Sequence, residues 1–237
     1  MVKKELIGKS PLRKLDDSIS GGLGVGNVGV IASRRGIGKT ACLVHIATDK
    51  LMAGKHVIHV SYAKRVDHII SWYEDIFREI SQKRNLENAM DVHDDIVRNR
   101  VIMNFNQEGT SVSQVIAGVS AMMDAGGIST DAVVIDGFDF TKASAGDLSA
   151  YKAFAVNKGI ELWFTDDYHR EDIDGPVLNE DGIPENLVSF LQDIQVIVTL
   201  KAEKDYLHLC LVKDHDRIIT EDLPLRLDPK SLLVAEL

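Results

Sequence analysis

Ser33-Arg34-Arg35-Gly36-Ile37-Gly38-Lys39-Thr40 is the stretch that decides the fold of this 237-residue chain. An apolar run over residues 28–32 precedes it and predicts a buried strand, and a helical pattern follows it as far as Gly54. Glycines between a strand and a helix let backbone amides converge on an anion, and the amino end of the helix adds a partial positive charge. The stretch is therefore predicted to be a phosphate-binding loop, or P-loop.

Each residue type in this loop suits a nucleoside triphosphate, for which we expect ATP with Mg²⁺. Lys39 is expected to reach the β- and γ-phosphate oxygens, and Thr40 is expected to ligate the metal. Ser33 stands where the full P-loop pattern has glycine. The candidate nucleotide-binding segment comprises Ser33, Arg34, Arg35, Gly36, Ile37, Gly38, Lys39, Thr40 and Ala41.

A second strand is expected to complete the metal site. Residues 132–136 read Ala-Val-Val-Ile-Asp, an apolar run that ends in a carboxylate. An unpaired carboxylate is costly near a sheet interior, so Asp136 is expected to hold Mg²⁺ through water, together with Thr40. Asp139 is a weaker candidate for the same region, and an ordinary strand-end aspartate is the alternative for Asp136.

Composition and charge narrow the class of protein. The length fits one α/β domain over residues 1–237, and the net charge of -9 disfavours a protein that binds chiefly to a duplex phosphate backbone. No apolar run approaches the roughly 20 residues of a membrane span, so we expect a cytoplasmic protein with no membrane partner. Cys42 and Cys210 lie far apart in apolar stretches and are expected to pack as reduced core thiols.

Apolar runs alternate with helical periodicity, which predicts an α/β fold with a mostly parallel sheet flanked by helices. The short polar connection at residues 202–205 predicts a C-terminal antiparallel hairpin at one sheet edge. The expected strands cover residues 28–32, 56–62, 100–105, 132–136, 160–165, 194–200 and 206–213. Helices are expected over residues 66–82, with Ile69, Ile70, Tyr73, Ile76, Phe77 and Ile80 on the buried face, and over residues 111–125, with Val112, Val115, Ile116, Val119 and Met122 inward.

Residues 166–185 form the most acidic stretch of the chain, with eight carboxylates and Arg170. Gly175, Pro176 and Gly182 interrupt any regular pattern, so we expect an exposed, mobile loop. A metal site at Asp166, Asp167 and His169 is the alternative to a solvated loop.

The chain resembles the RecA-like P-loop ATPases, in particular the branch of the KaiC, RadA and replicative-helicase (DnaB-like) motor domains. Residues 15–27, LDDSISGGLGVGN, look like the lead-in that this branch carries before its P-loop strand. Residues 29–40 look like the helicase-type P-loop, in which a small residue also replaces the first glycine. The resemblance implies a RecA-like ATP-binding core, ATP with Mg²⁺, and a homo-oligomer with nucleotide sites between subunits.

The resemblance also implies roles for residues outside the P-loop. Thr165 matches a polar residue that senses the γ-phosphate, and Lys213 matches a cation that points at the neighbouring subunit's nucleotide. The second residue of that cationic pair departs, because His215 stands in its place. No carboxylate follows the strand at residues 56–62, where the family has its water-activating Glu, which leaves Asp67 and Glu74 as weak candidates.

Three functions stay open on these observations. The first is a regulatory, nucleotide-dependent switch with weak or absent hydrolysis that acts on a protein partner, because loss of a general base costs about 10²–10⁴-fold in rate. The second is an active ATPase linked to DNA repair, recombination or replication, although the acidic stretch disfavours nucleic acid. The third is a degenerate P-loop scaffold for protein interaction.

Overall fold

The computed structural model describes residues 10–63, 65–106, 108–127, 129–168 and 178–237. The helices are α2 (Leu12–Ser18), α3 (Lys39–Met52), α4 (Asp67–Lys83), α5 (Ala89–Arg98), α6 (Val112–Gly126), α7 (Ala145–Lys158) and the 3-10 helix η1 (Glu185–Phe190). The strands are β1 (Val28–Arg34), β2 (Val57–Ser61), β3 (Arg100–Asn104), β4 (Ala132–Asp136), β5 (Glu161–Tyr168), β6 (Val196–Ala202), β7 (Leu207–Asp214), β8 (Arg217–Leu227) and β9 (Val234–Glu236).

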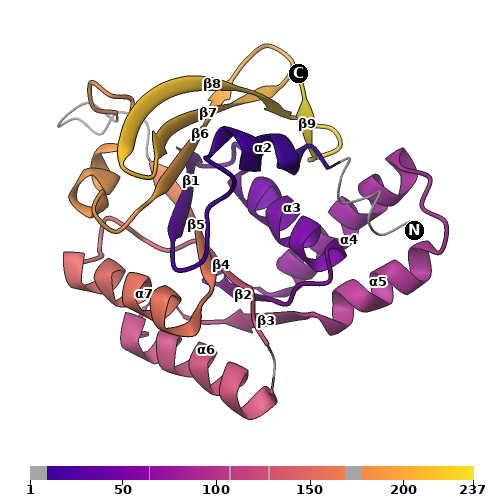
Figure 1. Cartoon of the computed structure of the whole chain (residues 1–237), viewed down its shortest axis with the longest axis horizontal. Coiled ribbons are helices and arrows are strands. Elements are labelled where there is room, and N and C mark those ends of the chain that lie inside the picture. Colours follow the sequence, from indigo (N-terminus) through magenta and orange to yellow (C-terminus); the bar gives the residue numbers. More distant parts are fainter. Residues whose placement is uncertain (1–9, 64, 107, 128, 169–177) are drawn as a thin grey trace.

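One nine-stranded sheet runs through the molecule in the order β3-β2-β4-β5-β1-β6-β7-β8-β9 (Figure 1). The pairs from β3 to β6 are all parallel, as crossover helices require, and the pairs from β6 to β9 are antiparallel. The predicted α/β fold with a mostly parallel sheet is therefore confirmed.

Two apolar cores lie on the two faces of this sheet. One contains buried side chains of α2, α3, α4 and α5, and the other contains those of α6, α7 and η1 (Figure 1). Strand β1 serves both cores, because successive side chains alternate: Val30 belongs to one and Ile31 to the other. Burial on both faces explains why the central strands read as continuous apolar runs.

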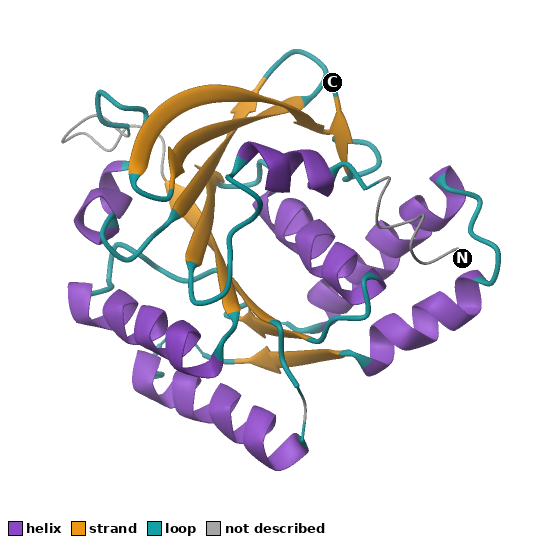
Figure 2. Ribbon diagram, viewed as in Figure 1, coloured by secondary structure: helices purple, strands orange, loops and turns teal. Residues whose placement is uncertain are grey.

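The antiparallel end of the sheet is larger than predicted. The connection between β6 and β7 forms the expected hairpin, but β8 and β9 continue the sheet beyond it, so the hairpin is not an edge. Strand β8 is long and strongly curved (Figure 2), and its alternating charged residues and Pro224 hid it from a search for apolar runs.

Three local predictions of exposure were wrong. Ile70 is 43% exposed and Met122 is 36% exposed, because each lies at the margin of the apolar face of its helix. Asp166, placed at the start of an exposed acidic loop, instead lies in β5 and is buried. Within residues 178–185, Ile183 is also buried, and His169 of the alternative metal site lies outside the described residues.

Both cysteines are free and buried, as expected. Within the described ranges, no helix combines the length and the apolar character that a membrane span requires.

Candidate nucleotide-binding site

The predicted P-loop lies between the carboxyl end of β1 and the amino end of α3, as its sequence context required. Gly36 and Gly38 have φ angles of 79° and 109°, a region that side chains with a Cβ rarely adopt. Gly38 is also the residue that precedes α3, and a Cβ there would lie 2.5 Å from Leu227 Cδ2. Both the turn and the close approach of β8 therefore require glycine at position 38.

Lys39 is buried beneath the loop, with 6% of its surface exposed. Its Nζ donates to the Ser33 carbonyl at 3.1 Å, to the Ser33 hydroxyl at 3.2 Å and to the Arg34 carbonyl at 3.0 Å. It also forms an ion pair with the carboxylate of Asp167. The departure at Ser33 thus places a hydroxyl acceptor on the lysine that a glycine would lack.

Two hydroxyls and one carboxylate meet beside this lysine. Thr40 Oγ1 lies 3.1 and 3.2 Å from the carboxylate oxygens of Asp136, and Thr165 Oγ1 donates to Asp136 Oδ1 at 2.8 Å. The Gly137 amide donates to Thr165 Oγ1 at 2.9 Å, which fixes the hydroxyl. Desolvation by burial raises the pKa of Asp136, while the hydrogen bonds from Thr165 and Thr40 oppose that shift.

This donor set fits Mg²⁺. The ion takes oxygen ligands, and the Thr40 hydroxyl and the Asp136 carboxylate already lie within hydrogen-bond distance of each other. A buried carboxylate whose charged form is disfavoured gains from a nearby cation. In a P-loop site the metal would neutralise charge on the phosphates.

A cavity of about 700 Å³ opens over these groups. Its lining includes most of the predicted segment, with Asp136 and Thr165. The further lining residues are Tyr62, Ala63, Trp72, Gly137, Asp167, Leu207, Leu227, Pro229 and Leu232. Arg34 and Ala41 are not among the lining residues, and Ser33 lies buried beneath the loop.

Sequence reasoning missed two features of this cavity. Asp167 was assigned to an acidic loop, but β5 extends three residues beyond the predicted end at Thr165 and carries Asp167 to Lys39. The apolar wall from Leu227, Pro229 and Leu232 follows a strand that was not predicted at all. The adjacent pair of aspartates directly after the sensor-like Thr165 was the available signal for Asp167.

The weak candidates for a general base lie elsewhere. Asp67 is exposed and pairs with Arg65, and Glu74 lies 2.7 Å from His93 Nε2. Neither residue lines the cavity, although Tyr62 and Ala63, which directly follow the second strand, do line it. The position after β2 therefore presents no carboxylate among the described residues there.

Lys213 and Asp139 also lie apart from the triphosphate end of the cavity. Lys213 is buried in β7 opposite Ile197, and its ammonium group donates to the His215 carbonyl. Asp139 accepts hydrogen bonds from Thr141 and pairs with Lys142, and it lines a neighbouring cavity.

Comparisons with known proteins place the fold. No protein-family model matches the chain, and no curated protein matches it. Among solved structures, the ATPase domain of a DnaB-like helicase is similar, with a TM-score of 0.68 and 15% sequence identity over 95% of this chain and 89% of that chain. The fold is RecA-like. At this identity the likeness establishes the fold alone, so the site rests on its own geometry.

Proposed function

We propose that this protein binds ATP with Mg²⁺ through the P-loop segment at residues 33–41 and acts as a nucleotide-dependent switch with weak or absent hydrolysis. The observation that carries the proposal is the convergence of Lys39, Thr40, Asp136 and Thr165 on one cavity. An ammonium group, two hydroxyls and a buried carboxylate at a helix amino end are what a magnesium triphosphate requires.

The apolar wall of the same cavity suits a nucleobase. Trp72, Leu207, Leu227, Pro229 and Leu232 line it, while the phosphate-binding groups lie along the loop. Ligand cavities commonly combine such an apolar surface with a few placed polar groups. Adenine is our proposed base.

Slow turnover is proposed because the described cavity lining carries no carboxylate on the β2 side. Asp167 is the carboxylate nearest to the phosphate-binding lysine, and it contacts Lys39 directly. A γ-phosphate that approached Lys39 would meet a like charge at Asp167, which weakens binding unless the carboxylate moves aside. Asp167 is therefore either a brake on ATP binding or, if it turns toward water, the missing base.

A single-turnover assay with γ-labelled ATP, Mg²⁺ and excess protein separates these roles. The wild type is expected to retain intact ATP, and Lys39→Ala is expected to lose it. Asp167→Asn is expected to bind ATP several-fold more tightly, because a negative charge beside the γ-phosphate is removed. Rapid, Lys39-dependent release of phosphate by the wild type would sink the switch, and loss of that release in Asp167→Asn would identify the base.

An active ATPase is the second candidate, and the likeness to the ATPase domain of a DnaB-like helicase favours it. In this reading the chain belongs with the KaiC, RadA and replicative-helicase motor domains, and single-stranded DNA is expected to stimulate phosphate release. No stimulation would remove the DNA link. Failure of the wild type to retain any nucleotide at millimolar ATP would support the scaffold reading instead.

Assembly is the remaining part of the proposal. We expect a homo-oligomer in which Lys213 approaches the nucleotide of the adjacent subunit, together with a separate protein partner. Sedimentation velocity with and without ATP tests the assembly, and Lys213→Ala should weaken ATP-dependent association. A monomer under both conditions would exclude a role for Lys213 between subunits.

A further inference from the structure

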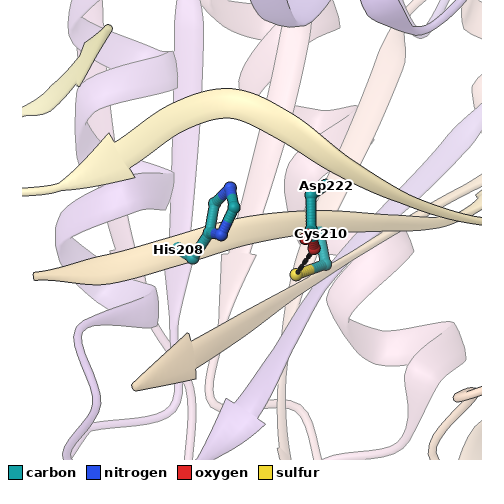
Figure 3. A group of neighbouring side chains, drawn as sticks. All are labelled: His208, Cys210 and Asp222. Atoms are coloured by element: carbon teal, nitrogen blue, oxygen red, sulfur yellow. Dashed lines mark hydrogen bonds between the residues drawn. The ribbon is translucent and has the colours of Figure 1, made fainter. Parts of the chain in front are cut away.

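A second group of chemically active side chains lies on β7 and β8, away from the P-loop. His208 and Cys210 are two residues apart on β7, so their side chains share one face of the sheet. Asp222 of β8 is paired with Cys210 across the two strands. Figure 3 shows the imidazole, the thiol and the carboxylate gathered together.

An irregularity in the strand pairing brings the carboxylate to this position. His208 pairs with Arg226 and Cys210 pairs with Asp222, so residues 223–225 of β8 stand opposite Leu209 alone. The extra residues include Pro224, which has no amide hydrogen for the ladder. A bulge of this kind bends its strand and re-aims side chains, and here it sets Asp222 against the thiol.

The contacts within the group already have the form of a ligand set. The Cys210 thiol donates to Asp222 Oδ1 at 3.1 Å, and one ligand atom from each of the three residues lies within 4.8 Å of the others. The ligand-to-ligand separations of a tetrahedral zinc site are about 3.3–3.8 Å, given metal–ligand bonds of about 2.0–2.3 Å. Asp222 is exposed and on a curved strand, so the required closure is small.

The histidine is held by a backbone contact of the kind that orients metal ligands. His208 Nε2 lies 2.8 Å from the Leu223 carbonyl oxygen, an acceptor that requires the proton on Nε2. The lone pair is then left on Nδ1. Metal-binding histidines characteristically use the second nitrogen in this way, which fixes both tautomer and ring orientation.

We propose that His208, Cys210 and Asp222 bind a zinc-class divalent cation, with the fourth position open to water. One nitrogen, one sulfur and one oxygen donor favour such a borderline-soft ion over Mg²⁺ or Ca²⁺, which prefer oxygen alone. Binding replaces the thiol proton, which leaves to solvent, and forms a metal–thiolate bond with no change in oxidation state. The ion would clamp β7 to β8 across the bulge.

This site is independent of the proposed nucleotide site. None of the three residues lines the P-loop cavity, to which β7 and β8 contribute Leu207 and Leu227 instead. Side chains alternate along a strand, so Leu207 and His208 point to opposite faces of the sheet. A failure of ATP binding would therefore leave the cation site standing, and the reverse also holds.

Titration of the full chain with Co²⁺ tests the proposal, because a cobalt–thiolate bond gives an intense near-ultraviolet charge-transfer band. The chain has two cysteines, so Cys42→Ala is a matched control for Cys210→Ala. The wild type and Cys42→Ala are expected to bind one Co²⁺ with this band, which Zn²⁺ displaces and excess Mg²⁺ does not. Cys210→Ala is expected to lose the band.

Asp222→Asn provides a second test on an exposed side chain, in case Cys210→Ala fails to fold by circular dichroism. It is expected to weaken Zn²⁺ binding, measured calorimetrically, by about 10–100-fold. Absence of a thiolate band in the wild type, its persistence in Cys210→Ala, or unchanged Zn²⁺ affinity in Asp222→Asn would each overturn the proposal.

Discussion

Replacement of Asp166 by Asn is expected to make the protein more stable at neutral pH and to leave it unchanged in mild acid. Asp166 is 2% exposed, and its Oδ1 accepts a hydrogen bond of 2.7 Å from Asn186 Nδ2. Its Oδ2 and Asn186 Oδ1 are both buried without a hydrogen-bond partner among the described residues. A protonated Oδ2 supplies a donor for that amide oxygen, whereas an ionised carboxylate leaves two acceptors unpaired.

The magnitude follows from the pKa of Asp166. Desolvation by burial raises this pKa to about 7, against the opposing hydrogen bond from Asn186 and with a further rise from the charge of Asp167. An ordinary aspartate has a pKa of about 3.9, so the folded state holds the proton over about three pH units longer than the unfolded state. Stability is full below about pH 4 and falls as the pH rises to about 7, by about 4 kcal/mol in total.

Urea unfolding of the wild type and Asp166→Asn across about pH 4 to 8 measures this difference. The variant should match the wild type at the acid end and exceed it progressively until about pH 7, where the gap levels off. Burial lowers the pKa of His45 and of His59 to about 3, which destabilises both proteins in acid, so that contribution cancels in the difference. Asp205→Asn, in the exposed turn before β7, is the control. A gap that does not change with pH would refute the reasoning.

Three further experiments test the P-loop cavity. Asp136→Asn removes a buried charge whose ionised form burial disfavours, so resistance to urea should rise while magnesium-dependent ATP retention falls at least about tenfold. Gly38→Ala should cost roughly 1–3 kcal/mol from its positive φ, with an added clash against Leu227. Combining it with Leu227→Ala should recover the clash alone, giving a coupling free energy of about 0.5–3 kcal/mol in a double-mutant cycle, and an additive result would exclude the contact. Trp72 lines the cavity and Trp163 is buried beside β1, so ATP should change the fluorescence of Trp163→Phe and not that of Trp72→Phe.

Local sequence signals predicted the parallel half of the sheet well. The strand at residues 132–136 was predicted with its observed bounds, because a run that is buried on both faces is apolar at every position. Helix α6 was predicted to within one residue at each end, and Ser111 and Gln114 form the capping box at its start while Gly127 adopts φ 59° at its end. The antiparallel half was predicted only in part, because β8 is buried at few positions and its pairing depends on neighbours distant in sequence.

The sequence by itself determined the identity of the phosphate loop, since glycine spacing, the lysine and the threonine act within a few bonds of one another. Asp136 could be added because parallel strands end on the same edge of a sheet, which brings Thr40 and Asp136 together. Only the tertiary structure decided that Asp167 pairs with Lys39, that Leu227 closes over Gly38 and that Cys210 meets Asp222. Each of these contacts joins strands through their lateral order and register, which hydrogen bonding across the whole sheet sets and no short stretch of sequence encodes.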